Sequence, residues 1–190
     1  MRALTFEYFG IAQSELNSAK AIGARAGVLE HRIVRLPDLK EAGDIQGFRP
    51  RGLPQTYVPL RNSIFYAFAA SYAEETEAGS IIGGHNRDDA EVFVDVSSEF
   101  FRSLQKALWS GSRILRANKT RIVRPLKDKR KAEVIKLAAS LGVPLELTWS
   151  CHRDTKEHCW QCEGCHSRMS CFAEAGVKDP LAPSNLEKIT

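Results

Sequence analysis

Apolar positions along the chain fall into two kinds of pattern, short apolar runs and longer stretches with helical spacing. The short runs predict four strands, over residues 3–6, 31–36, 80–84 and 121–125. The helical spacing predicts helices over 12–26, 62–77, 97–108 and 131–141, and a shorter one over 168–175 that ends at Gly176. The run over 80–84 is apolar at its centre and ends in two glycines, which is typical of a strand fully buried in a parallel sheet.

Strands and helices alternate in this order, which predicts an α/β fold with a three-layer parallel sheet. Such sheets bind ligands beyond the carboxyl ends of their strands, so the loops that follow the strands are where function is expected. Residues 37–56 are rich in glycine and proline and are predicted to form a loop. We divide the chain into an α/β nucleotide and substrate domain over 1–147 and a polar, cysteine-rich segment over 148–190 that packs on it.

The composition narrows the class of protein. The 190 residues are 43% hydrophobic and 26% charged, which fits a compact soluble domain and excludes a disordered, collagen-like or coiled-coil chain. The net charge of +4 is too small to indicate a nucleic-acid coat, so no direct nucleic-acid partner is expected. No run approaches the ~20 apolar residues of a membrane span. We therefore expect a cytoplasmic protein without a membrane partner.

All five cysteines lie between Cys151 and Cys171. Four of them have the spacing C-x7-C-x2-C-x2-C, namely Cys151, Cys159, Cys162 and Cys165. Two-residue gaps let thiolates turn toward one centre, as tetrahedral Zn²⁺ requires, and four thiolates leave no open position. The pattern predicts a structural zinc site. Disulfides and an iron–sulfur cluster are the alternatives, although the bacterial ferredoxin run places its fourth cysteine after three residues and before a proline.

The remaining candidate ligands in this segment have simpler interpretations. Cys171 falls in the middle of a predicted helix and is expected to be a small buried hydrophobic residue. His152, His158 and His166 could substitute as ligands, but four well-spaced thiolates make solvent-facing loop histidines the favoured interpretation.

Polar side chains gather where predicted strands end and helices begin. Arg61 precedes a long helix, where a guanidinium suits a phosphate or carboxylate, and Asn62 could bind a ligand or serve as the N-cap. Gly84 and Asn86 follow the buried strand, where a glycine permits a ligand to approach the backbone or simply makes a turn. Lys131 stands in the first turn of its helix, against the dipole, which suggests an anionic partner or a solvated lysine.

Acidic residues follow Asn86 in the chain. They could hold Mg²⁺ or orient a substrate, and a charged surface loop is the alternative. These acids are Asp88, Asp89, Glu91 and Asp95.

Several segments resemble the 7-cyano-7-deazaguanine synthase family. The most specific is Thr148-Trp-Ser-Cys151 joined to the four-cysteine spacing. The others are 3–8, 57–62, 84–86, 95–100, 124–126, 131–134 and 174–180.

The resemblance implies an adenine-nucleotide α-hydrolase-like (PP-loop ATPase) fold and an ATP-dependent C–N ligase that forms a nitrile. In this reaction 7-carboxy-7-deazaguanine is adenylated, ammonia gives an amide, and a second activation dehydrates it, in queuosine or archaeosine biosynthesis. The implied cofactors are ATP with Mg²⁺ and structural zinc on the four cysteines. Arg61 and Lys131 would stabilise developing charge, while Arg61, Asn62, Gly84 and Asn86 would bind the nucleotide. A homodimer is compatible with this assignment.

The sequence departs from the family pattern at three places. No Ser-Gly-Gly-x-Asp-Ser phosphate loop occurs, and Pro59-Leu60-Arg61-Asn62 stands where the family has Pro-Gly-Arg-Asn. The family's Phe-Asp-Tyr-Gly-Gln is altered to Phe6-Glu7-Tyr8-Phe9-Gly10. We expect the loop and its strand to lie upstream of Ala3, so that the strands over 3–6 and 80–84 would flank an open slot. Another tRNA-modifying PP-loop ATPase and a zinc-stabilised non-catalytic module are the alternative functions.

Overall fold

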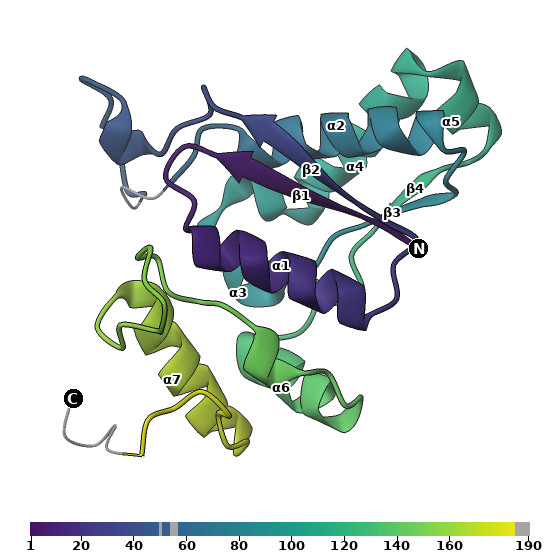
Figure 1. Ribbon diagram of the computed structural model, residues 1–190. Helices are drawn as coiled ribbons and strands as arrows, with labels where there is room; N and C mark the ends of the chain where they lie inside the picture. The colour runs from purple at the N-terminus through teal and green to yellow at the C-terminus, as the bar shows by residue number, and fades with distance from the viewer. Residues whose placement is uncertain (50, 54–56, 185–190) are drawn as a thin grey trace. The chain divides into compact units, whose positions relative to one another are not determined.

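The computed structural model describes residues 1–49, 51–53 and 57–184 (Figure 1). It is a mixed α/β fold with parallel strands, β1 (Arg2–Tyr8), β2 (Glu30–Leu36), β3 (Ser80–Ile82) and β4 (Arg121–Val123). The α-helices are α1 (Gln13–Arg25), α2 (Arg61–Glu75), α3 (Arg87–Val92), α4 (Ser98–Gly111), α5 (Arg113–Ala117), α6 (Lys131–Ser140) and α7 (Glu163–Ala175). Short 3₁₀ turns are η1 (Ala42–Asp44), η2 (Val94–Val96) and η3 (Leu145–Leu147).

The chain divides into two compact units. Unit 1 comprises Met1–Asp38 and Ala132–Thr190, and unit 2 comprises Leu39–Lys131. This division is by contacts, and the proposed boundary after residue 147 stays a prediction. None of the helices in the described ranges is both long enough and apolar enough to cross a membrane.

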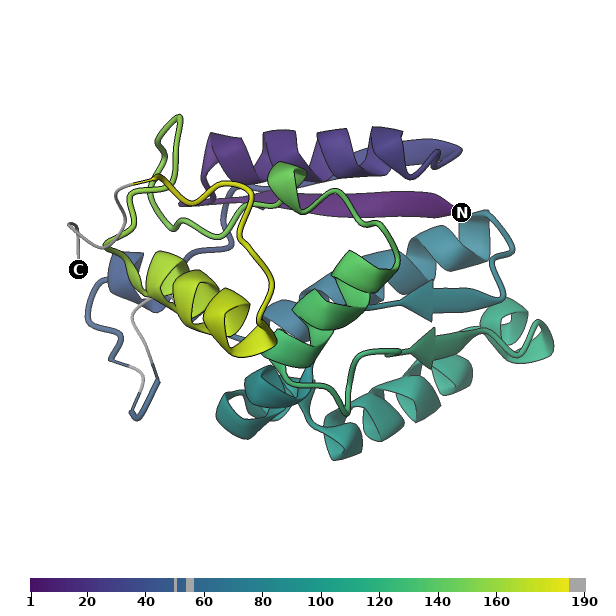
Figure 2. The same cartoon turned by 90° about the horizontal axis from the view of Figure 1, so that it is seen from below.

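Unit 1 is built on the pairing of β1 with β2. The two strands are parallel and in register from Arg2 opposite Glu30 to Tyr8 opposite Leu36. Parallel strands need a crossover, and α1 supplies it, running alongside the pair in both views (Figures 1 and 2). The carboxylate of Asp154 accepts the first N–H of α1, from Gln13, at 3.0 Å. A residue of the cysteine-rich segment thus caps the helix that connects the first two strands.

Unit 2 holds a hydrophobic core around a second parallel pair, β3 and β4. The core takes Tyr66, Ala70 and Ala73 from α2, Ile81 from β3, Phe101 from α4 and Leu115 from α5. The indole N–H of Trp109 donates to the Thr120 carbonyl at 2.7 Å, which ties α4 to the start of β4. Ser97 caps α4, since its hydroxyl accepts the Phe100 N–H at 3.1 Å.

Most of the elements predicted from periodicity are confirmed within a few residues, but the sheet differs. The four described strands form two separate two-stranded sheets, because hydrogen bonds join only β1 with β2 and β3 with β4. The expectation of a fully buried strand over 80–84 is wrong: β3 ends at Ile82, whose exposure is 62%, and only Ile81 is buried.

Three further differences concern helices. α5 was not predicted, and α3 forms where a charged loop was one interpretation, because Asn86 accepts the Asp89 N–H and caps it. α7 begins five residues before the predicted helix, at Glu163. Its first turn contains Gly164, where an added Cβ would meet the Ser150 carbonyl, so close packing rather than helix propensity fixes this end.

The predicted loop over 37–56 contains the short turn η1, where Ala42 is fully buried and donates its N–H to the Tyr57 carbonyl at 2.7 Å. Residues 50 and 54–56 of this loop, and 185–190 of the predicted C-terminal segment, lie outside the described residues.

Candidate functional site

The structure brings the four cysteines of the predicted zinc site together. Their sulfur atoms all lie within 4.8 Å of one another. The Cys151 and Cys162 sulfurs are 3.8 Å apart, and those of Cys159 and Cys165 are 3.9 Å apart. Four sulfurs placed ~2.3 Å from a central zinc ion at tetrahedral angles are separated by ~3.8 Å, so this arrangement fits zinc.

Local folding explains how the sulfurs meet. Cys162 is the N-cap of α7 and Cys165 lies in its first turn, which directs both toward the segment around Cys151. Cys151 and Cys165 are fully buried. The N–H groups of His152 and Arg153 donate to the sulfurs of Cys162 and Cys151 at 3.5 and 3.4 Å. Such N–H donors stabilise thiolates over thiols.

The cluster cannot easily hold four negative charges by itself. Burial raises the pKa of Cys165 to about 12. At Cys159 burial also opposes ionisation, but hydrogen bonds, first among them one from the Gln161 backbone, bring the pKa down to about 6. A bound divalent cation would stabilise the remaining thiolates and release their protons.

The prediction that His158 faces solvent is wrong, because its exposure is 7%. Its ring lies 4.4 Å from that of Trp149 and 5.2 Å from that of Trp160, and its Nε2 accepts the Ser150 N–H at 3.1 Å. Burial, reinforced by the nearby Arg168 cation, lowers the His158 pKa and so favours the neutral ring that this hydrogen bond requires.

The other side chains considered as ligands lie outside the sulfur group. His152 and His166 are exposed, as predicted, although His166 lies in α7 rather than in a loop. Cys171 is half-buried rather than buried, and its sulfur lies 4.0 Å from the Ser167 hydroxyl.

The interpretation of Asn62 as an N-cap is wrong, because α2 begins one residue earlier, at Arg61. Asn62 is buried in the first turn, and its side-chain amide donates to the Asp95 carbonyl at 3.3 Å. The Asp95 carboxylate accepts the Asn62 N–H, also at 3.3 Å, and so stabilises the helix start. The N-cap position itself is Leu60, with a left-handed φ of 52°.

The candidate residues after β3 are held by hydrogen bonds within unit 2. Asn86 caps α3 and donates its amide to the Asp89 carboxylate at 2.8 Å. An added Cβ at Gly84 meets nothing within 4 Å, whereas one at Gly83 would meet the Tyr66 hydroxyl. Gly83 is therefore the glycine that another side chain, Tyr66, approaches closely, whereas the space beside Gly84 is open.

The anion suggested for Lys131 is found within the protein. Its ammonium lies 3.2 Å from Asp89, and its N–H donates to Asp88 at 2.8 Å. Asp88 also accepts from Arg130 at 2.7 Å. The Lys131 N–H, with Arg130 adding to it, lowers the Asp88 pKa despite partial burial. An acidic pair thus offsets the unfavourable cation at the start of α6.

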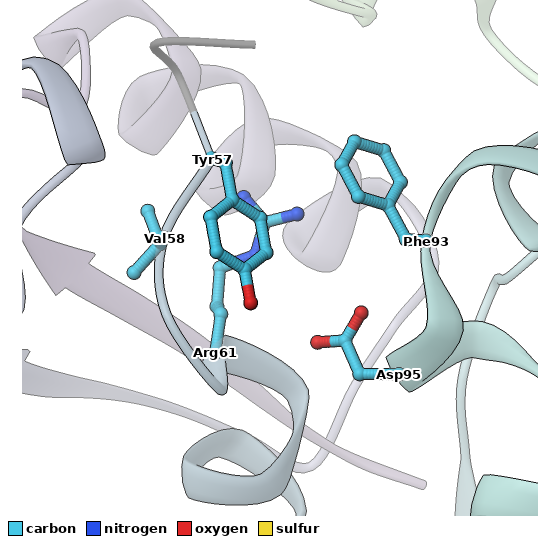
Figure 3. Close-up of a pocket in the computed structure, with 5 residues that line it drawn as sticks. All are labelled: Tyr57, Val58, Arg61, Phe93 and Asp95. Carbon is cyan, nitrogen blue, oxygen red and sulfur yellow. The ribbon is translucent and has the colours of Figure 1, made fainter. Parts of the chain in front are cut away.

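A small pocket lies beside the start of α2 (Figure 3). It is lined by Tyr57, Val58, Arg61, Phe93 and Asp95. The rings of Tyr57 and Phe93 are nearly parallel, 9° apart, with centroids 6.4 Å from each other. Arg61 was predicted from the sequence as a site residue, and Asp95 was one of four candidate acids, but the two aromatic residues were not predicted. The one sequence signal that could have identified Tyr57 as a site residue is its position four residues before Arg61.

Comparison with known families decides the class. The family model described as queuosine biosynthesis protein QueC matches residues 1–176. The chain belongs to the QueC family. This confirms the resemblance stated from the sequence, and the match includes the QueC segments that carry the four cysteines and the pocket residues.

Three QueC relatives illustrate the similarity, and each is named 7-cyano-7-deazaguanine synthase. The protein of Thermosynechococcus vestitus is 36% identical, over 94% of this chain and 83% of its own length. That of Trichodesmium erythraeum is 37% identical, over 94% and 87%. That of Thermoplasma acidophilum is 34% identical, over 95% and 80%.

Proposed function

We propose that this chain is an ATP-dependent 7-cyano-7-deazaguanine synthase, a C–N ligase that converts 7-carboxy-7-deazaguanine and ammonia to the nitrile. The observation that carries the proposal is the similarity to synthases of this name over 94% of the chain. Membership of the QueC family and the parallel strand pairs support a three-layer PP-loop ATPase fold. The proposed location is the cytoplasm, where reduced cysteines are available for a metal.

The chemistry requires a carboxylate to become an electrophile. Transfer of an adenylyl group from ATP releases pyrophosphate and makes a carboxylate oxygen part of a leaving group. Ammonia then attacks the carbonyl carbon and loses a proton, and AMP departs to leave an amide. A second activation takes place on the amide oxygen, whose loss together with protons from nitrogen forms the nitrile. Arg61, beside the pocket, and Lys131, at the start of α6, are the proposed groups that stabilise the negative charge of these steps.

Asn62, Gly84 and Asn86 are the proposed nucleotide-binding residues, together with Arg61. Gly84 is the one whose surroundings favour this most, because no described residue other than its chain neighbours lies within 4 Å of where its side chain would begin. Asn62 and Asn86 have structural hydrogen bonds, to Asp95 and Asp89, which fix their positions.

Zinc is the proposed metal, held by Cys151, Cys159, Cys162 and Cys165. The sulfur spacing described above supports a closed tetrahedral site, and a closed site supplies structure rather than a bound nucleophilic water. The reaction therefore depends on the metal only through folding of the segment that contains these ligands.

The test is conversion of 7-carboxy-7-deazaguanine in the presence of ATP, Mg²⁺ and ¹⁵N-labelled ammonia, with mass spectrometry of the product. We expect a nitrile that carries one labelled nitrogen. The assay uses this chain and, in parallel, the product of the gene read in frame upstream of Met1, since no Ser-Gly-Gly-x-Asp-Ser loop occurs in the sequence. Light scattering on the same samples tests the proposed homodimer.

Matched variants assign the role of Arg61. Arg61→Ala is expected to lower kcat/KM by about 100-fold, the usual cost of one charge-stabilising group. Arg113→Ala removes an exposed arginine from the start of α5 and is expected to change nothing. Nitrile formation by neither form of the protein would contradict the proposal, and a folded, zinc-loaded protein without ATP affinity would favour the non-catalytic module.

A further inference from the structure

The pocket beside α2 combines three kinds of group that a single ligand class needs together. Tyr57 and Phe93 contribute parallel aromatic faces, Asp95 a carboxylate and Arg61 a guanidinium (Figure 3). All belong to unit 2, and the buried Val58, 2% exposed, also lines the pocket. Aromatic faces stack on flat heterocycles, whereas the two charged groups discriminate among the edges of such a ring.

Asp95 is fixed in place by the first turn of α2. Its Oδ2 accepts the Asn62 N–H and its carbonyl accepts the Asn62 amide, both at 3.3 Å. Among the described residues its Oδ1 makes no hydrogen bond, and a carboxylate has about four acceptor sites in total. The carboxylate is therefore oriented before any ligand binds, with acceptor capacity to spare, and it is only half-buried.

A carboxylate is an acceptor-only group, so it selects ligands with adjacent donors. A guanine-type ring has two such donors side by side, the N1–H and the 2-amino group. An adenine ring has no N1–H and places its amino group elsewhere. Arg61, which is always charged and donates only, suits the keto and carboxylate oxygens that the same ring would carry. The two charged groups thus match a deazaguanine carboxylate better than the adenine of ATP.

We propose that this pocket recognises the deazaguanine ring of the substrate, with Asp95 accepting hydrogen bonds from the N1–H and 2-amino group and the rings of Tyr57 and Phe93 providing the stacking surface. The assignment rests on the proposed function, and it makes Asp95 the specificity-determining residue. It also distinguishes the deazaguanine ring from the adenine ring of the nucleotide, because the donor edge that Asp95 recognises is absent from adenine.

The experiment compares 7-carboxy-7-deazaguanine with its 2-oxo analogue, 7-carboxy-7-deazaxanthine, which replaces the 2-amino group with an oxygen and N3 with N3–H. Their affinities for the full chain are measured by calorimetry. Asp95→Asn keeps an oxygen for the Asn62 N–H but turns donors toward the ligand, which suits a 2-oxo group. We expect this variant to bind the 2-amino ligand about 100-fold more weakly and the 2-oxo ligand about tenfold more tightly than the wild type does.

Asp128→Asn is the matched control. It removes the same charge from a side chain that is 82% exposed and is expected to leave both affinities unchanged. Phe93→Leu should weaken both ligands equally, by about tenfold, because stacking does not sense the 2-position. The gain for the 2-oxo ligand in Asp95→Asn is a readout that misfolding could not produce.

The outcomes separate the two proposals. Wild-type conversion of substrate together with unchanged ligand preference in Asp95→Asn overturns the pocket assignment and leaves the proposed function intact. Asp95-dependent binding of the 2-amino ligand without any conversion supports the pocket and contradicts the function. Absence of binding of either ligand to the wild type overturns the pocket assignment.

Discussion

Different interactions stabilise the cysteine-rich segment of unit 1 and the hydrophobic core of unit 2. In unit 2 the buried cluster is apolar and draws on four elements, α2, β3, α4 and α5. The segment that follows η3 is stabilised by polar and metal-binding groups instead. These are the four sulfurs, the Arg168–Asp179 ion pair and a histidine packed between two tryptophans.

This difference predicts how substitutions affect the stability of each region. Apolar packing is non-directional, so losing one side chain costs roughly in proportion to the surface and volume that are removed. A buried charge or a metal ligand has one correct partner, and losing that partner leaves the other without compensation. We therefore expect graded effects in unit 2 and abrupt ones in the cysteine-rich segment.

The largest effect should follow loss of the metal ligands. Structural zinc sites contribute about 10–16 kcal/mol in small domains, so Cys162→Ser is expected to release the metal and unfold residues 148–184. Hydrogen exchange measured by mass spectrometry should rise there and stay low in peptides from α2 and α4. Cys171→Ser, which alters the cysteine outside the sulfur group, should keep zinc. Stoichiometric zinc retained by Cys162→Ser would contradict the assignment.

The buried ion pair should rank second. Arg168 donates to both oxygens of Asp179, at 2.6 and 2.7 Å, and to the Thr148 hydroxyl at 2.8 Å. Arg168→Ala leaves the buried Asp179 carboxylate without its cation and should cost about 3–5 kcal/mol in urea unfolding. Arg168→Met with Asp179→Leu should recover much of this loss, since neither charge then remains. A cost below about 1 kcal/mol for Arg168→Ala would show that the segment does not depend on the pair.

Overpacking tests the graded behaviour of unit 2. The Tyr66 hydroxyl is buried without a hydrogen-bond partner among the described residues, and burial raises the Tyr66 pKa to about 12. Because this hydroxyl occupies the space beside Gly83, Gly83→Ala should cost about 1–3 kcal/mol. Tyr66→Phe alone should be neutral or slightly stabilising and should relieve part of that cost. Strict additivity in the double-mutant cycle would contradict the contact.

A polar contact of unit 2 should show a smaller effect that depends on pH. The pKa of Asp88 is lowered in the folded protein, so its contribution is complete above the unfolded pKa of ~3.9 and is lost as pH falls through the folded value. Asp88→Asn should cost about 1 kcal/mol at pH 7 and remove this part of the acid dependence. Urea unfolding between pH 2.5 and 7 measures both; parallel curves for the two proteins would contradict the prediction.

The smallest effect concerns the left-handed residue before α2. Leu60 has a φ of 52° and an exposure of 63%, where the family pattern has glycine. Leu60→Gly removes strain of about 1–2 kcal/mol but adds freedom to the unfolded chain, so a net gain of about 0.5 kcal/mol is expected. Leu141→Gly, at an exposed leucine without a positive φ, should destabilise instead. Equal losses in both variants would show that Leu60 is unstrained.

The two regions also differ in how much of their structure the sequence alone predicts. The four metal ligands span only fifteen positions, from Cys151 to Cys165, so their spacing nearly determines that the sulfurs can meet. The burial of His158 escaped prediction because it depends on how Trp149 and Trp160 fold around the ring.

In unit 2 the helices were predictable from their apolar faces, but the pocket was not. Tyr57 and Phe93 are thirty-six positions apart, and only tertiary packing makes their rings parallel. The pairing of strands was likewise hidden, because periodicity identifies a strand without naming its neighbour. Asn62 illustrates the same limit. The local sequence favours it as the N-cap of α2, but the helix begins at Arg61, and the Asp95 carboxylate, from a turn distant in the sequence, accepts the Asn62 N–H.

The most direct test of this account is elemental analysis of the purified full chain, grown without added metal. A four-thiolate zinc centre that holds the cysteine-rich segment predicts one zinc per chain. Iron in its place, or a folded protein without metal, would contradict the central claim.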